Sequence, residues 1–265
     1  MAVSRSLEPP GLRWNVDIWS IDVTGRGTAD RLTTNPASDN DPAFSYDGRQ
    51  IAFNSVRTGT FSLFRRPSSP GGEDEPLGVA KGTATAPDWS RDGRFLMFTE
   101  QAQETQTDLW YLSFPSRKKT SYLHTSFEER SGTFSPDGRW VAYESNVTSR
   151  LEIYVDSFPE PKGPTRISRD GGRVPRWRGD GRELFFLAPD GTMMAAGIET
   201  ANGIHSTTPR SLFKTSLTIP NNYHTFAVAH DGRRFLLPVR LNTQDFASIT
   251  VVLNWPAKLP SHARR

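Results

Sequence analysis

The sequence of 265 residues predicts an all-β protein, a β-propeller of about six four-stranded antiparallel blades. Three observations lead to this prediction. A turn motif of the form aromatic-x-x-Asp-Gly-Arg occurs four times, and a looser fifth copy follows Phe226. A second short apolar segment follows each copy, and no stretch has convincing helical periodicity. The Asp residues of the turns are 45, 45, 43 and 51 residues apart. Four short strands in about 40–50 residues are typical of a propeller blade.

Each Asp-Gly pair is predicted to form the tip of a β-hairpin. Glycine adopts a positive φ without steric cost, and an aspartate carboxylate accepts hydrogen bonds from the backbone of its own turn. We therefore assign these residues a structural role and no catalytic one. The predicted turn residues are Asp47, Gly48, Asp92, Gly93, Asp137, Gly138, Asp180, Gly181, Asp231 and Gly232.

The order of the motifs predicts one propeller over residues 14–256, with a flexible lead-in at 1–13 and a tail at 257–265. Residues 14–34 match only the second half of a blade, because Asp17-Ile18-Trp19 fits the second segment and no hairpin precedes it. The full units are predicted at about 38–80, 83–125, 128–168, 171–215 and 221–256.

Five units and one half leave two alternatives, because a propeller must close to remove its sheet edges. The N-terminal half-blade could complete a six-blade ring with a defective first blade. Alternatively, the chain is the C-terminal part of a longer protein that supplies the missing hairpin. We favour the second alternative.

Composition limits the classes of function. The absence of cysteine excludes disulfides and thiolate chemistry. A formal charge of +3 and a pI of about 9.3 are a mild basic bias, which favours an ordinary solvated surface over nucleic-acid binding. No apolar run is long enough for a membrane segment, and the N-terminus lacks the apolar region of a secretory signal. We expect a monomer that is cytoplasmic as written, or extracytoplasmic if it belongs to a membrane-spanning parent.

The turn motif resembles the TolB-type, WD-like propeller repeats of bacteria, in which an aromatic residue precedes Ser-Pro-Asp-Gly-Lys/Arg and an apolar strand. The resemblance covers about 14–256. Only Ser135-Pro136-Asp137-Gly138-Arg139 matches the motif in full. The other copies have Tyr46, Arg91, Gly179 and His230 in place of the proline.

A narrower resemblance concerns residues 88–96, 132–143, 175–177 and 249–255. These segments are similar to the propeller region C-terminal to the kinase domain in certain bacterial eukaryotic-like serine/threonine kinases, abundant in acidobacteria. That resemblance implies a sensor or interaction module in signalling. It implies no kinase activity, because the chain has no Gly-rich loop before a Val-Ala-x-Lys strand, no His-Arg-Asp loop and no Asp-Phe-Gly.

The sequence predicts no catalytic residue, no metal site and no cofactor. The chain has no Gly-x-Ser-x-Gly elbow, and its five histidines show no metal-ligand spacing. If a binding site exists, the propeller fold places it at the channel mouth, where loops enter the innermost strands. The candidate binding residues there are Asp41, Asp88, Glu129, Arg130, Arg173, Arg176, Tyr223 and His224.

Three functions remain open on this basis. The favoured one is a non-enzymatic scaffold that binds a protein or peptide in sensing or signalling. The second is an enzyme with a polar channel-mouth site, lyase or glycoside-acting, which needs a paired acid and base. The third is a TolB-like periplasmic adaptor, against which the missing signal peptide argues. Convergence of the candidate residues within hydrogen-bond reach would favour the enzyme.

Overall fold

The computed structural model describes residues 2–6, 15–22, 28–78, 82–102, 106–215, 217, 226–239 and 248–252. All regular elements in these ranges are β-strands, and the named strands pair antiparallel. None of the described residues forms a helix suited to crossing a membrane. The predicted all-β class with antiparallel sheets is therefore confirmed. The chain divides into two compact units, Met1–Gly132 and Thr133–Arg265, and each is described by itself.

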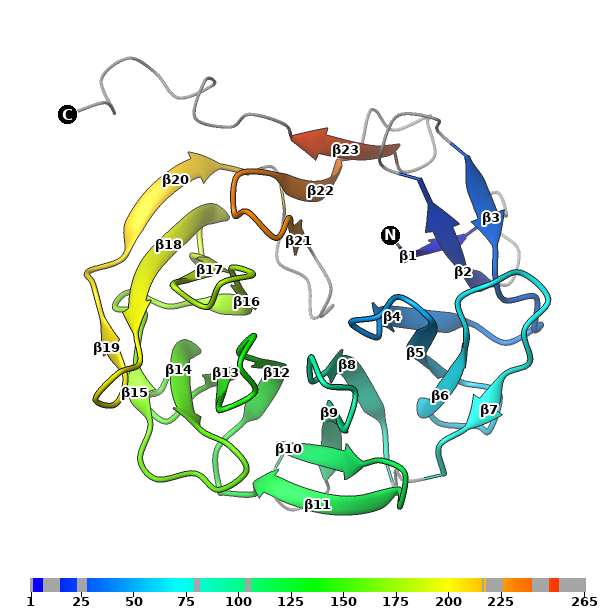
Figure 1. Ribbon diagram of the computed structural model, residues 1–265, viewed down its shortest axis with the longest axis horizontal. Coiled ribbons are helices and arrows are strands. Elements are labelled where there is room, and N and C mark those ends of the chain that lie inside the picture. The colour runs from blue at the N-terminus through cyan, green and yellow to red at the C-terminus, as the bar shows by residue number, and fades with distance from the viewer. Residues whose placement is uncertain are drawn as a thin grey trace. The chain divides into compact units, whose positions relative to one another are not determined.

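The first unit contains three sheets whose strands follow one another in chain order (Figure 1). The first sheet consists of β1 (Ala2–Ser6), β2 (Val16–Ile21) and β3 (Ala29–Arg31). The second consists of β4 (Asp39–Phe44), β5 (Gln50–Ser55), β6 (Ser62–Pro67) and β7 (Glu75–Pro76). The third consists of β8 (Ala84–Trp89), β9 (Phe95–Ala102), β10 (Gln106–Ser113) and β11 (Lys118–Leu123).

The boundary between the units lies within β12 (Glu129–Phe134), the first strand of the next sheet. This sheet continues with β13 (Trp140–Ser145), β14 (Glu152–Ser157) and β15 (Thr165–Arg166). The following sheet consists of β16 (Arg173–Trp177), β17 (Glu183–Leu187), β18 (Thr192–Glu199) and β19 (His205–Ser206), and β20 (Arg210–Lys214) also pairs with β18. The last consists of β21 (Ala227–Val228), β22 (Phe235–Val239) and β23 (Ser248–Val252).

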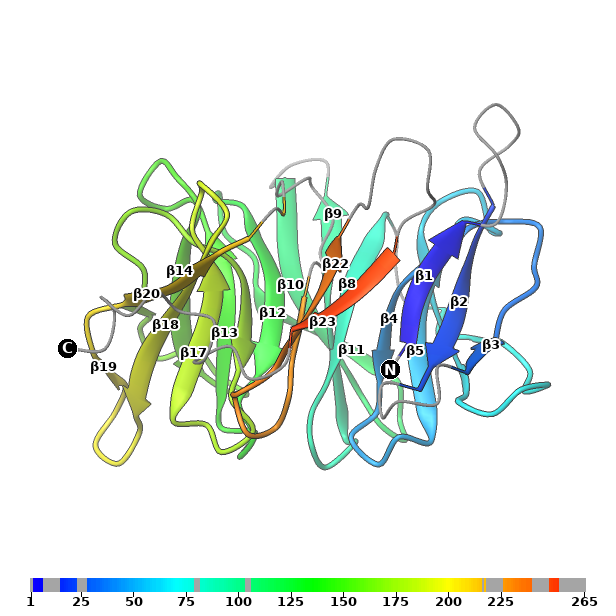
Figure 2. The ribbon, with the colours of Figure 1, turned by 90° about the horizontal axis from the view of Figure 1, so that it is seen from above.

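The predicted lead-in at 1–13 includes a strand at residues 2–6. These residues form β1, which pairs with β2 in the register Ala2↔Ser20 to Ser6↔Val16. Figures 1 and 2 both show β1 beside β2. The physical reason is that β2 would otherwise present a row of unpaired N–H and C=O groups on one edge. The segment carries no Asp-Gly turn, so the repeated motif does not include it.

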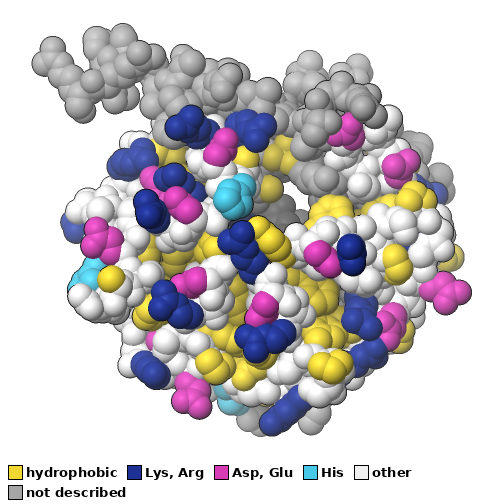
Figure 3. All heavy atoms as spheres, in the orientation of Figure 1, with side chains coloured by type: hydrophobic (Ala, Val, Ile, Leu, Met, Phe, Trp, Pro, Cys, Tyr) yellow, Lys and Arg dark blue, Asp and Glu magenta, His cyan; other side chains and the backbone are white. Residues whose placement is uncertain are grey.

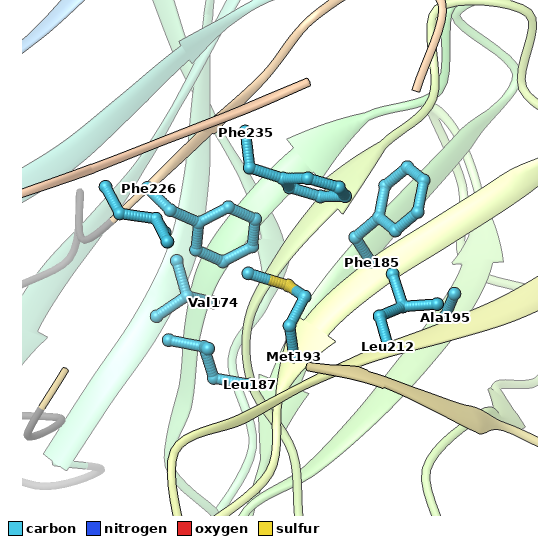
Figure 4. Close-up of a cluster of buried hydrophobic side chains, with 9 residues drawn as sticks. Val174, Phe185, Leu187, Met193, Ala195, Leu212, Phe226 and Phe235 are labelled. Atoms are coloured by element: carbon cyan, nitrogen blue, oxygen red, sulfur yellow. The ribbon is translucent and has the colours of Figure 1, made fainter. Parts of the chain in front are cut away.

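Consecutive sheets within each unit pack face to face through apolar side chains. In the first unit, Ile18 and Leu32 of the first sheet meet Phe53 of the second, whose Leu63 in turn meets Phe98 of the third. The same arrangement recurs in the second unit. One cluster there combines Ala142, Ile153, Val155 and Ile167 with Leu184, Phe186, Ala196 and Ile198. The other, drawn in Figure 4, joins β16–β20 to the last sheet.

The Asp-Gly turns have the predicted conformation. The five turn glycines have φ between 69° and 75°. In the turn of Ser135, the serine Oγ donates to Asp137 Oδ1 at 2.6 Å and accepts from the Trp140 backbone N–H at 3.0 Å. The turns that begin at Ser45 and Ser90 repeat both bonds. Hydrogen bonds to the carboxylates contribute to lowering the pKa of the turn aspartates in these three copies.

We expect Ser135→Ala to lower the free energy of unfolding by about 1–2 kcal/mol, because it removes two hydrogen bonds from a residue that is 3% exposed. Urea denaturation measures the change. Ser121→Ala replaces an exposed serine of β11, is the matched control and should stay within about 0.5 kcal/mol of wild type. Equal stability of Ser135→Ala and wild type would show that the serine contributes nothing to the turn.

The limits of the predicted units, the blade count and ring closure stay predictions. The predicted tail at 257–265 lies outside the described residues.

Candidate functional site

The strands β4, β8, β12 and β16 each begin a sheet, and each has a backbone irregularity at the same place in the repeat. Pairing with the next strand shifts register between Asn40 and Ala43 in β4, and equivalent shifts occur in β8 and β16. The residue six positions before the turn aspartate has a left-handed backbone, with φ of 51° at Asp41, 55° at Ser131 and 54° at Val174. Such β-bulges redirect side chains. The candidate residues therefore do not follow the simple strand alternation that the sequence suggests.

Three candidates of the first unit occupy different surroundings. Asp41 accepts a hydrogen bond from Asn54 Nδ2 at 2.8 Å. Arg130 is 6% exposed and forms an ion pair with Glu128 at 2.6 Å. Asp88 is half-buried in β8, opposite Met97 of β9. These contacts fix individual strands and loops.

Glu129 is 3% exposed and belongs to a small polar cluster. Its Oε1 accepts a hydrogen bond from Thr125 Oγ1. Nearby, the fully buried Asp108 bonds His124 Nδ1 at 2.8 Å. Burial raises the pKa of Glu129 and the Asp108 charge adds to the rise, while Thr125 and His124 oppose it. The carboxyl group is thus held where its charged form is unfavourable.

We expect Glu129→Gln to raise the free energy of unfolding at pH 7, because a neutral amide avoids the cost of burying a charged carboxylate. A carboxyl whose pKa is raised by folding loses its contribution to stability as the pH rises through that value. Glutamine avoids this loss and still accepts the Thr125 bond. The gain should shrink as the pH falls toward 4, where the wild-type carboxyl becomes protonated in both states.

Denaturation of both proteins at pH 7 and pH 4 measures this difference. Thr125→Val is the companion variant and should destabilise at either pH, because the hydroxyl also accepts the Phe127 N–H at 3.1 Å. A Glu129→Gln protein that is less stable than wild type at pH 7 would contradict the assignment.

Two candidates of the second unit, Arg173 and Arg176, both lie on β16 but have different partners. Arg173 Nε donates to Glu144 Oε2 at 2.7 Å, and the Val174 N–H donates to Glu144 Oε1 at 2.8 Å. Glu144 is fully buried. Arg176 instead donates to the Pro175 carbonyl at 2.8 Å and lies 6.0 Å from the Phe226 ring centre. The remaining candidates, Tyr223 and His224, lie outside the described residues.

Sequence reasoning missed buried carboxylates that recur near the beginning of one strand in each of three sheets. Asp17, Asp108 and Glu152 are 0–1% exposed. Asp17 pairs with Arg31 at 2.6 Å, and burial raises the pKa of Asp17. Glu152 accepts from Arg150 Nε at 2.6 Å and the Gly171 N–H at 3.0 Å. A sequence signal for these carboxylates exists, because each acidic residue directly precedes Ile or Leu in the second apolar segment of its repeat.

Two open polar grooves lie at equivalent places in the two units. The first groove, of about 520 Å³, is lined by Arg31, Thr34, Asn35, Arg66 and Asp74 among others. The second groove, of about 420 Å³, is lined by Arg166, Ser168, Arg169, Ser206 and Thr207 among others. The equivalence rests on Thr33 and Ser168, since the Ile18 N–H bonds the Thr33 hydroxyl at 2.9 Å and the Ile153 N–H bonds that of Ser168 at 2.7 Å.

Charges of both signs are interspersed on the surface drawn in Figure 3. Within the ranges that the structure describes, no group of three or more His, Asp or Glu side chains is arranged to hold a metal ion.

A family model described as the TolB β-propeller domain matches residues 10–154. The chain belongs to the TolB β-propeller domain family. Among solved structures, TolB from Acinetobacter baumannii superimposes with a TM-score of 0.74 at 17% identity, over 96% of this chain and 61% of that protein. Putative TolB from Agrobacterium tumefaciens gives 0.63 at 19% identity, over 80% of this chain and 82% of that one. No curated protein matches the sequence.

Other structural neighbours show that the fold is shared by unrelated activities. A prolyl endopeptidase superimposes with a TM-score of 0.56 at 14% identity, over 95% of this chain and 42% of the peptidase. This TolB-family chain spans 61% of the length of the Acinetobacter protein. Likeness at such identities concerns the fold alone, so function has to be argued from the side chains.

Proposed function

We propose that this chain is a non-enzymatic binding module whose partner is a protein or a peptide. The observation that carries the proposal concerns Glu144. Its two carboxylate oxygens accept hydrogen bonds from Arg173 Nε and from the Val174 N–H. A general acid or base must reach its substrate. The buried Glu144 instead fixes the bulge of β16, and Arg173 forms an ion pair with it.

Further support comes from the character of the exposed surface. The two grooves are open and polar, with arginine and hydroxyl side chains in their walls. Such surfaces suit hydrogen bonding to a polypeptide. The interspersed charges in Figure 3 are more typical of protein recognition than of the large basic areas that bind nucleic acids.

Selection from a displayed library of random peptides tests the proposal. The full chain is immobilised, enriched peptides are synthesised, and their affinity is measured by titration calorimetry. We expect one family of related peptides with dissociation constants in the micromolar range. Enrichment of no family, together with turnover of a glycoside or peptide substrate by the same preparation, would overturn the proposal.

A TolB-like adaptor is the second candidate, favoured by the family match over 10–154 and by the likeness to the Acinetobacter TolB. This role would place the chain outside the cytoplasm. Fractionation of cells that express the complete gene product tests this placement. Recovery in the periplasmic fraction would favour the adaptor, and recovery in the cytoplasm would count against it.

A sensor role in kinase signalling is the narrowest form of the proposal. Its support is the resemblance of residues 88–96, 132–143, 175–177 and 249–255 to kinase-associated propellers. Sequencing the reading frame upstream of this chain tests it. A kinase domain there would support the sensor role, and an unrelated or absent upstream domain would reject it.

A further inference from the structure

The second groove differs from the first in how its arginines are neutralised. In the first groove, Arg31 is paired with Asp17 at 2.6 Å and Arg66 with Asp74 at 3.1 Å. In the second groove, Arg166 and Arg169 are both exposed, and neither forms an ion pair with any residue that the structure describes. The arginines of the first groove are thus neutralised by carboxylates, whereas those of the second groove are not neutralised by any described residue.

The reason lies in the buried carboxylate beneath each groove. Asp17 and Glu152 occupy the same place in their repeats. Each directly precedes an isoleucine whose N–H donates to a hydroxyl, that of Thr33 in the first unit and that of Ser168 in the second. Asp17 is available to Arg31, whereas Glu152 is occupied by Arg150 at 2.6 Å, by the Gly171 N–H and by the Ser168 hydroxyl. Arg166, which corresponds to Arg31, is left without the carboxylate that its repeat position would supply.

Hydrogen bonds to neighbouring residues hold the side chain and the backbone of Arg169 in the second groove. Arg169 Nη2 donates to Thr208 Oγ1 at 3.1 Å, and its carbonyl accepts from Arg150. Asp170 is almost fully exposed and lies 3.8 Å from Arg150. The exposed Ser206 adds a hydroxyl to the walls. The groove therefore offers two guanidinium groups and hydrogen-bonding side chains to an anionic ligand.

The strands around the groove favour a polypeptide over a small anion. β15 is the last strand of its sheet, and β19 is the last on the path of the next. A terminal strand has an edge whose N–H and C=O groups lack a strand partner, and extended peptides add to such edges. In an extended peptide, alternate side chains point the same way, so acidic residues at alternate positions can face both arginines.

We propose that the second groove binds an acidic polypeptide segment in extended conformation, with its carboxylates held by Arg166 and Arg169. This inference rests on the proposed binding function and names the partner class and the place of contact. The groove volume of about 420 Å³ is within the range that accommodates small ligands, which corresponds to a few side chains of such a segment.

The test uses a fluorescein-labelled hexapeptide of alternating threonine and glutamate, titrated with the full chain in a fluorescence polarisation assay. We expect saturable binding that weakens as salt is added from 50 to 300 mM, since the contact is ionic. The double variant Arg166→Gln/Arg169→Gln should bind about tenfold more weakly or worse. Arg182→Gln removes another exposed arginine of the second unit and should bind as wild type does.

Two competitors identify the ligand chemistry. The threonine–glutamine hexapeptide should not displace the probe, because it lacks carboxylates, and inorganic phosphate should displace it only at concentrations far above those of the unlabelled acidic peptide. Equal competition by phosphate on a molar basis would replace the peptide proposal with a simple anion site. Absence of probe binding, or equal loss in Arg182→Gln, would overturn the proposal.

A failure of the groove assignment can be distinguished from a failure of the proposed binding function. If library selection yields binding peptides that the acidic hexapeptide does not displace, the binding function stands and the groove assignment fails. If neither library peptides nor the acidic hexapeptide binds, both fail. Circular dichroism of the double variant verifies its fold, and both substituted side chains are exposed, so their replacement leaves the core intact.

Discussion

Glu144→Ala is expected to lower the free energy of unfolding by about 3 kcal/mol, which is the cost of breaking a buried ion pair by removing one partner. Glu144 has a side chain only 1% exposed, and that of Arg173 is 17% exposed. The substitution leaves the guanidinium of Arg173 and the N–H of Val174 without their acceptor. Denaturant unfolding of the variant at pH 7 measures the loss.

Two further variants show whether the loss comes from this contact. Glu144→Gln keeps an acceptor for the Val174 N–H and should cost less than the alanine variant. In a double-mutant cycle, Arg173→Ala should cost less in the Glu144→Ala background than in wild type, because the arginine has already lost its partner. A Glu144→Ala protein within 0.5 kcal/mol of wild type would contradict a structural role for the carboxylate.

Phe235→Ala should also have a large effect, a loss of about 3–5 kcal/mol in the free energy of unfolding, typical of deleting a buried aromatic ring. Phe235 is 1% exposed and meets Phe185 edge to face, with ring centres 5.0 Å apart and an interplanar angle of 89°. The ring centre of Phe213 lies 5.4 Å from that of Phe235. Figure 4 shows the rings of Phe235 and Phe185 as neighbours in this buried cluster.

Two control variants accompany this prediction. Phe235→Leu refills most of the volume and should cost clearly less than alanine. Phe127→Ala removes a phenylalanine that is 40% exposed and should change the stability by no more than about 0.5 kcal/mol. Equal losses for Phe235→Ala and Phe127→Ala would show that the cluster joining the last two sheets contributes little.

The fold could be predicted from the sequence because its signals are local and repeated. An Asp-Gly pair specifies a turn whose glycine needs a positive φ, and this holds in every copy. The apolar run after each turn forms a buried strand, as Val141 to Tyr143 in β13 illustrate. The strand β1 was not predicted, because it forms by pairing with the edge of β2 and residues 2–6 carry no strand signal of their own.

The candidate site was less predictable because side-chain partners are long-range. Arg173 and Glu144 are 29 residues apart, and no spacing rule connects them. The left-handed residues Asp41, Ser131 and Val174 differ in type, so the bulge they share has no sequence signature. By contrast, the buried carboxylates Asp17 and Glu152 could have been found from their common place before isoleucine.

The central claim is that this TolB-family chain binds a polypeptide and leaves it chemically unchanged. The most direct measurement incubates the full chain with its tightest library-selected peptide at saturating concentration, then analyses the peptide by mass spectrometry. We expect the peptide to be recovered intact after it has been shown to bind. A peptide that is cleaved or modified by wild type, but not by Glu129→Gln, would contradict the claim and identify the Glu129 cluster as a catalytic site.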